Sequence, residues 1–280
     1  MSNEAYHADT SRISNSGLKL IGKSPAHYYA KYLDPNRGPE VRTKALRHGS
    51  AIHAAILEPT EFKNLFATVP VHAPNKPTSA QLRAKKPSDE TVEAIAWWSA
   101  WEAENVGKEI LTAAEFALSQ NVKDAVYNHP AAAMLLEMVR CEETFVFEEP
   151  QSGAPCKIKT DAFSENTGLI VDIKTCEDAS DRGIIRSVLT YGYDHQAAFY
   201  FDGFTYATGN KPYGFAFIFV EKEPPFAVNV KYVPSEMFAL GRRKYLANCL
   251  TYMECKRTDQ WPAYGDEITP IELPDYILNK

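Results

Sequence analysis

Three strand-like runs between residues 142 and 175 constrain the fold more than any other stretch of the chain. ETFVFEE, CKIKTDAF and GLIVDIKT are rich in β-branched and aromatic residues, and turns at 151–155 and 164–168 separate them. Helical patterns precede these runs. A helical region from residue 182, two further strand runs (PYGFAFIFVE and PFAVNVKYV) and a helix at 235–256 follow them. The pattern predicts an α/β fold with a central mixed sheet flanked by helices, and extra helices toward the N-terminus.

The second and third runs deliver charged side chains near their ends. Asp161 lies in the second run, and Asp172 and Lys174 lie in the third. Residues i and i+2 of a strand point to the same face, so Asp172 and Lys174 share a face, and a hairpin would bring Asp161 within reach of them. Two carboxylates and an ammonium at one sheet edge suit a divalent cation with an activated water beside it.

The triplet [Asp/Glu]-x-Lys alone carries little information. It occurs three times, at 61–63, 172–174 and 254–256, and about two matches are expected by chance in a chain of this composition. Only the middle triplet ends an apolar strand run that another carboxylate precedes. The alternative is a salt bridge on a solvated sheet face, worth less than about 1 kcal/mol. The spacing alone favours neither interpretation.

Composition excludes several classes of protein. The chain has 280 residues, 45% of them hydrophobic, which is enough for a sizeable core. Five scattered cysteines without a CxxC pair indicate reduced thiols in a cytoplasmic protein, and argue against a zinc ribbon or an iron–sulfur cluster. No apolar run approaches the roughly 20 residues of a membrane span, and the N-terminus is too polar for a signal peptide. The net charge of −6 weighs only mildly against nucleic-acid binding, because a local groove can be basic.

Three further features each have a structural and a functional interpretation. His53 lies among small residues in GSAIHAA, and a lone helical histidine is usually structural unless other residues recruit it. The basic run Arg83, Lys85 and Lys86 falls in a Pro- and Lys-rich stretch. Such a run is usually a solvated face, with a nucleic-acid contact as the alternative. Trp97, Trp98 and Trp101 stand at helical spacing, which predicts packing rather than stacking on bases.

The order of these features resembles the RecB-like branch of the PD-(D/E)xK nuclease superfamily. That branch has a His in a small-residue helix, a Glu at the first strand, an Asp, then Asp-x-Lys and a helical Gln-x-x-x-Tyr. The chain offers matching residues in the same order, namely His53, Glu143, Asp161, Asp172 with Lys174, and Gln196 with Tyr200. The segments SNSGLKLIGKSPAHYYAKYL and WPAY are also similar to RecE-type exonucleases. Five ordered elements are far more specific than any one of them.

The resemblance implies a restriction-endonuclease-like core in a single nuclease domain over residues 1–280. Residues 1–140 would be the mainly helical portion that carries His53, 141–258 the core sheet and its helices, and 259–280 a tail. It also implies a duplex-DNA exonuclease that processively digests the 5′-ended strand and leaves a 3′ tail for strand annealing. The expected partners are DNA ends, a single-strand annealing protein and further copies of the chain in a ring, with a tetramer favoured over a trimer.

The resemblance also implies roles for individual residues. Asp161, Asp172 and the backbone carbonyl of Ile173 would bind Mg²⁺, and His53 would complete the site so that Mn²⁺ is also accepted. Glu143 would hold a second metal or a water, with the adjacent Glu142 as its competitor on the opposite face. Lys174 would orient and help deprotonate the attacking water, and would stabilise the charge that develops on the phosphate. Gln196 would position the water or the scissile phosphate. Tyr200 would pack or hydrogen-bond behind Gln196.

A 5′-phosphate pocket is expected as well, with Ser14, Ser16, Lys19 and Arg47 as candidates and Arg83, Lys85 and Lys86 as further DNA contacts. Two other functions stay open at this point. One is another nuclease of the superfamily, such as an endonuclease or a subunit of a repair complex. The other is a non-catalytic DNA-binding module that retains the fold.

Overall fold

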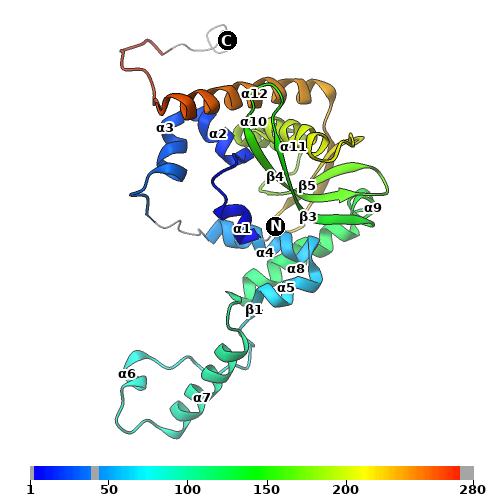
Figure 1. Ribbon diagram of the computed structural model, residues 1–280. Coiled ribbons are helices and arrows are strands. Elements are labelled where there is room, and N and C mark those ends of the chain that lie inside the picture. The colour runs from blue at the N-terminus through cyan, green and yellow to red at the C-terminus, as the bar shows by residue number, and fades with distance from the viewer. Residues whose placement is uncertain (1–2, 39–43, 272–280) are drawn as a thin grey trace.

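The computed structural model describes residues 3–38 and 44–271 (Figure 1). Its centre is a five-stranded sheet with the order β3-β4-β5-β6-β7. Strands β5 and β6 pair in parallel and the other neighbours are antiparallel, so the predicted mixed sheet is confirmed. The strands are β3 (Val139–Glu148), β4 (Pro155–Ser164), β5 (Leu169–Cys176), β6 (Gly214–Glu221) and β7 (Val228–Tyr232).

Helices cover both faces of this sheet (Figure 1). Before the sheet come α1 (Asn3–Ala8), α2 (Asn15–Lys23), α3 (Pro25–Tyr28), the π-helical turn η1 (Tyr29–Leu33), α4 (Lys44–Leu57), α5 (Pro59–Leu65), α6 (Ser79–Leu82), α7 (Asp89–Glu104), α8 (Ala113–Asn128) and α9 (Pro130–Leu135). Within and after it come α10 (Asp181–Tyr191), α11 (Tyr193–Thr208) and α12 (Ser235–Thr258). Among the residues that the structure describes, no helix has both the length and the apolar character needed to span a bilayer.

The sheet separates two hydrophobic cores. The first core lies between the sheet and α2, α11 and α12, and contains Ile158, Ile170 and Phe217. The second lies between the opposite face and α4, α8 and α9, and contains Val171 and Ile173. On β5 the even-numbered residues therefore face α11. Asp172 and Lys174 belong to this series, since side chains alternate along a strand.

Strands β3 and β4 exchange faces part-way along their length. In β4, Ile158 packs in the first core but Ala162 packs in the second. In β3, Cys141 packs against the second core and Phe145 against the first. The two residues of each pair are four positions apart and would share a face in a regular strand. The alternation of faces is therefore interrupted between the two members of each pair. Glu142 lies at the break with φ 55°, in the left-handed region that non-glycine residues seldom adopt.

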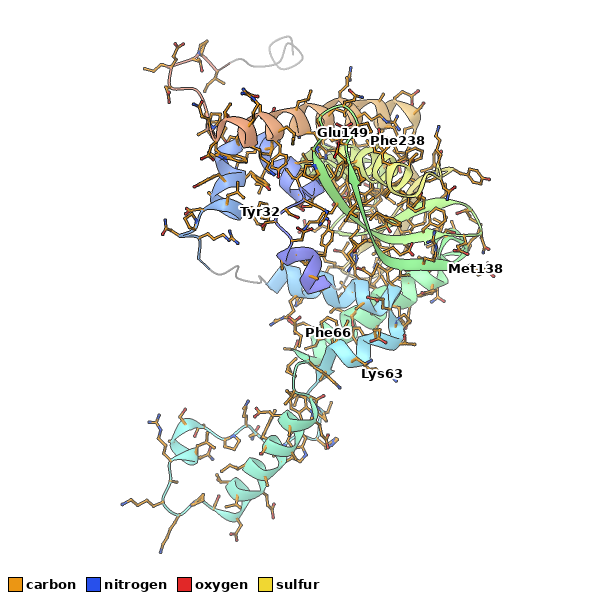
Figure 2. All side chains as sticks on the ribbon, in the orientation of Figure 1. Tyr32, Lys63, Phe66, Met138, Glu149 and Phe238 are labelled. Carbon is orange, nitrogen blue, oxygen red and sulfur yellow. The ribbon has the colours of Figure 1, made fainter. Side chains whose placement is uncertain are left out.

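Residues 69–108, which we call the arm, project from the body (Figure 1). At its base, β1 (Phe66–Thr68) pairs in parallel with β2 (Glu109–Leu111). The three tryptophans of α7 pack on one another, with Trp97 and Trp101 stacked at 6.3 Å and Trp98 edge-on to both. The expectation that they pack is confirmed. Side chains spread out sparsely along the arm, whereas they crowd together in the body (Figure 2).

We predict that Gly241→Ala lowers the free energy of unfolding by about 3 kcal/mol. Gly241 lies where α12 crosses α11, and an added Cβ would stand 2.0 Å from the backbone oxygen of Asp194. The two helices would have to move apart, as urea denaturation would report. Gly49→Ala is the matched control, because nothing lies within 4 Å of its Cβ position and alanine favours a helix by up to about 1 kcal/mol. Equal stability changes in the two variants would contradict the close packing of α11 on α12.

Candidate active site

Strands β4 and β5 diverge just beyond their hairpin turn. Their paired register runs only from Ser164 opposite Leu169 to Ala162 opposite Val171. At the next position along the two strands, the Asp161 carboxylate takes the place of a backbone acceptor. Its Oδ2 accepts a hydrogen bond of 2.8 Å from the Ile173 N–H. The divergence opens the sheet, so that side chains from its two faces can meet there.

Three ligand-type side chains converge at this opening. His53 reaches it from α4, and its Nδ1 lies 3.4 Å from Asp161 Oδ2. A carboxylate oxygen of Glu142 completes the group, with the three donor atoms all within 4.8 Å of one another. One imidazole nitrogen and two carboxylate oxygens at this separation fit a divalent cation. All three side chains are half-buried, which leaves room for a substrate to approach.

Asp172 and Lys174 form a buried ion pair beside this group. Asp172 is only 1% exposed, so the alternative of a salt bridge on a solvated face is wrong. Its Oδ1 pairs with the Lys174 ammonium, and its Oδ2 accepts a hydrogen bond of 2.5 Å from Gln196 Nε2. A buried carboxylate needs both partners, because removal from water without them costs several kcal/mol.

The close carboxylates change the proton affinity of the site. Burial, followed by repulsion from Asp172, raises the pKa of Asp161 to about 6. Burial opposes the charge on Lys174, but attraction by Asp172 and Asp161 outweighs it and raises the pKa of that ammonium. Lys174 is therefore a cation near neutral pH, suited to donating hydrogen bonds and stabilising negative charge.

Helix α11 supplies Gln196 and Tyr200 one turn apart, as the resemblance implied. The pKa of the Tyr200 phenol is raised well above its ordinary value, by burial first and then by the electrostatic influence of Tyr6, Asp172 and Asp161. The phenol therefore stays neutral. It packs on the first core beside the site and can act only through hydrogen bonds.

The structure places Glu142, not Glu143, at the opening. Glu143 forms an ion pair of 2.9 Å with Arg140. Glu142 lies beside His53 and Asp161, where it also pairs with Lys159 at 2.5 Å. The change of face at Glu142 explains the difference, because strict alternation no longer holds across it. Lys159 was missed, although its place two residues before Asp161 on one strand was a signal.

The candidates for phosphate binding fall in different places. Lys19 is brought near Lys174, and burial and repulsion by that ammonium lower its pKa to about 8. Arg47 is instead held by Glu115 at 2.7 Å. Ser14 caps α2 by accepting from the Gly17 N–H at 3.3 Å, and its neighbour Ser16 is exposed. The segment 83–88, with Arg83, Lys85 and Lys86, lies on the arm away from the sheet (Figure 1).

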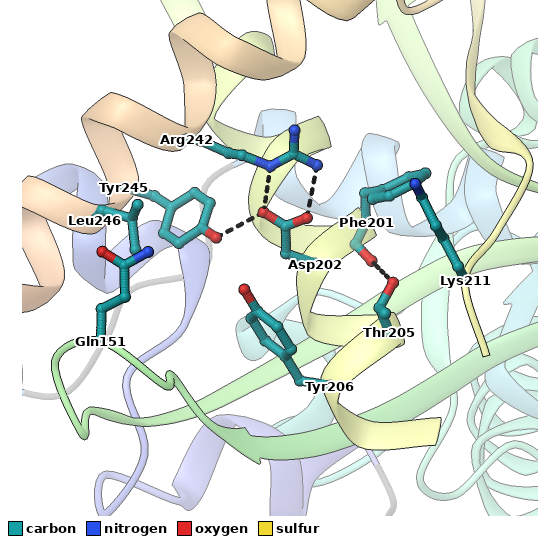
Figure 3. A pocket seen from close by; sticks show the side chains of 9 residues that line it. All are labelled: Gln151, Phe201, Asp202, Thr205, Tyr206, Lys211, Arg242, Tyr245 and Leu246. Atoms are coloured by element: carbon teal, nitrogen blue, oxygen red, sulfur yellow. Dashed lines mark hydrogen bonds and ion pairs between the residues drawn. The ribbon is translucent and has the colours of Figure 1, made fainter. Parts of the chain in front are cut away.

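The opposite side of α11 is fixed to α12 (Figure 3). Asp202 accepts two hydrogen bonds of 2.7 Å from Arg242 and a third of 2.7 Å from the Tyr245 hydroxyl. These residues line a pocket of about 330 Å³. Asp202 follows Gln196 by six residues, which turns it away from the active site. The network therefore holds in place the helix that presents Gln196.

Comparison with known proteins agrees with this geometry. Residues 14–274 match the family described as a PDDEXK-like domain of unknown function (DUF3799). The chain belongs to this family. No curated protein matches it.

Solved structures extend the comparison to the fold. The crystal structure of the "putative exonuclease" of Eubacterium rectale is similar over 99% of this chain and 97% of its own, with a TM-score of 0.60 and 15% identity. A phage-related exonuclease from Haemophilus somnus 129PT matches over 67% of this chain and 92% of its own, with a TM-score of 0.34 and 11% identity. The first similarity supports the PDDEXK-like fold assigned to the family, and the second is too distant to add to it.

We predict that Glu142→Gln weakens Mg²⁺ or Mn²⁺ binding by about tenfold or more, and that Glu143→Gln leaves it unchanged. Of these two glutamates, Glu142 offers its carboxylate to the opening, whereas Glu143 is paired with Arg140. The metal-induced rise in melting temperature, titrated for each variant, measures the difference. His53→Ala should behave like Glu142→Gln. The reverse ranking of the two glutamates would contradict the placement of Glu142.

The metal-induced rise in melting temperature should also depend on pH. Protons compete with the metal for Asp161, whose pKa is raised to about 6. Metal stabilisation should therefore be full at about pH 7.5 and fall as the pH is lowered through about 6 toward 5. Asp161→Asn should weaken metal binding across this pH range, because it removes one of the carboxylate ligands. A wild-type protein with equal stabilisation at both ends of the range would contradict the prediction.

Proposed function

We propose that the protein is a metal-dependent nuclease that hydrolyses phosphodiester bonds of DNA. One observation carries the proposal: Asp161, Asp172 and Lys174 meet at the divergence of β4 and β5, with His53 and Glu142 beside them. A divalent cation bound there would supply Lewis-acid activation of a water and of the scissile phosphate. Membership of a PDDEXK-like family supports the same chemistry.

The protein's own residues have distinct tasks in this proposal. Lys174, held as an ammonium, orients the attacking water and stabilises the negative charge that develops on the phosphate. Gln196 keeps Asp172 in one orientation through its 2.5 Å hydrogen bond. His53, Glu142 and Asp161 provide the donor atoms for the cation. The burial of Asp172 strengthens its interactions with Lys174 and Gln196, because little water screens them.

The finer proposal is a RecE-type exonuclease that uses Mg²⁺ and also accepts Mn²⁺. It would digest the 5′-ended strand of duplex DNA processively and leave a 3′ tail for an annealing protein. The ordered residues from His53 to Tyr200 support it, as does the similarity of the N-terminal segment to that family. A ring of copies is part of this proposal, since a basic channel inside a ring reconciles DNA binding with a net charge of −6.

An end-labelled linear duplex and a closed circle of the same sequence test this function. We expect Mg²⁺-dependent release of the 5′ label from the linear duplex and no cleavage of the circle. Cleavage of the circle would favour an endonuclease of the same superfamily. Excess unlabelled competitor added after digestion starts would test processivity, and light scattering would give the mass of the assembly.

Lys174→Ala should lower the digestion rate by about 10²- to 10³-fold while duplex binding persists. Lys63→Ala is a matched control, because Lys63 ends another [Asp/Glu]-x-Lys triplet but is exposed on α5. If Asp172→Ala and Lys174→Ala both left every measured activity unchanged, a non-catalytic DNA-binding module would be the better account.

A further inference from the structure

Tyr193 is the first residue of α11, and no role has yet been assigned to it. The preceding Gly192 has φ 62°, a left-handed conformation that glycine adopts without steric cost. This glycine lets α10 turn directly into α11. As a result, the Tyr193 ring lies against the sheet, 5.5 Å from the ring of Phe217 on β6.

The ring of Tyr193 lies against the ammonium of Lys174. Lys174 Nζ is 5.0 Å from the centre of the Tyr193 ring and 5.9 Å from that of Phe217. Two aromatic rings and the Asp172 carboxylate therefore contact one ammonium. A cation over an aromatic face gains about 0.5–2 kcal/mol, with the larger value where water is excluded. Lys174 is only 17% exposed.

The contact between Lys174 and the Tyr193 ring does not depend on metal binding, whereas the ion pair of Lys174 with Asp172 does. Asp172 stands beside the proposed metal site, and a carboxylate that neutralises a divalent cation attracts a neighbouring ammonium less strongly. The lysine side chain has four rotatable bonds and would then regain conformational freedom. An uncharged aromatic ring does not compete for Mg²⁺, so its attraction for Lys174 persists when metal and DNA are bound.

A second lysine approaches the same ring. Lys19 Nζ lies 6.0 Å from the centre of the Tyr193 ring and donates a hydrogen bond of 2.7 Å to the Tyr191 carbonyl. Two ammoniums from α2 and β5 thus lie near one neutral ring. A carboxylate in that position would draw both cations away from an incoming phosphate, whereas a ring leaves their charge available to it.

We propose that Tyr193 is a positioning residue that holds the Lys174 ammonium in place for phosphodiester hydrolysis. The inference rests on the proposed nuclease function. It adds a residue that does not belong to the motif of the resemblance, in which the tyrosine is Tyr200. Its aromatic ring carries the effect, and its hydroxyl group is dispensable.

Tyr193→Leu and Tyr193→Phe test the role of the ring. With labelled linear duplex and Mg²⁺, we expect Tyr193→Leu to lower kcat about tenfold, equivalent to about 1.4 kcal/mol, and to change KM little. Tyr193→Phe should retain nearly full activity. Tyr232→Leu, at an exposed tyrosine on the edge strand β7, is the control for loss of a ring. A loss of activity in Tyr193→Phe equal to that in Tyr193→Leu would overturn the proposal.

A measurement without turnover separates this proposal from the nuclease function. In protein labelled with ¹³C-lysine, the Cε–Hε signal of Lys174, assigned with Lys174→Arg, should show an upfield ring-current shift. We expect the shift to decrease in Tyr193→Leu, where only the more distant ring of Phe217 remains, and to be retained in Tyr193→Phe. An unchanged signal in Tyr193→Leu would refute the contact, whatever the activity. Wild-type protein inactive on every DNA would instead overturn the nuclease function.

Discussion

The burial of the Asp172 carboxylate is the constraint on which the rest of this structure depends. An isolated charge that is 1% exposed would cost several kcal/mol. Lys174 on the same strand and Gln196 on α11 offset this cost, so the carboxylate is tolerated only after helix and sheet have come together. The contacts with Lys174 and Gln196 that make the buried carboxylate compatible with folding also hold it in one orientation in the proposed active site.

The divergence of β4 and β5 makes the site accessible from both faces of the sheet. Lys174 and Asp172 point toward α11, while His53 arrives from α4 on the opposite face. Asp161 joins the two groups, because it touches His53 and also accepts from the Ile173 N–H. A fully paired hairpin would close the gap and leave these side chains on separate surfaces. Incomplete pairing of the strands is therefore part of how the site is built.

Much of this site could be predicted from the sequence, for identifiable physical reasons. A period of two places Asp172 and Lys174 on one face, and a spacing of four places Gln196 and Tyr200 on one face of a helix. The sequence could not distinguish Glu142 from Glu143 as the residue at the site. Glu142 has a left-handed backbone conformation, which interrupts the alternation of side chains between the two faces of β3. Glutamate seldom adopts this conformation, so the sequence gives no sign of it. Contacts between residues far apart in the sequence could not be predicted either. The ion pair of Arg47 with Glu115 joins residues 68 positions apart, and the three-residue strands at the base of the arm are too short to give a pattern.

Helix α11 connects the stability of the fold to the precision of the site. Its far side is held by Asp202 with Arg242, and its first turn is held by His195, whose ring contacts Asn15 at 2.8 Å and Asn248 at 3.2 Å. None of these contacts involves a proposed metal ligand. Yet they decide where α11 lies, and hence whether Gln196 reaches Asp172 and Tyr193 reaches Lys174. Since displacements near 1 Å can cost about a hundredfold in rate, substitutions on α12 should affect catalysis through position rather than through charge.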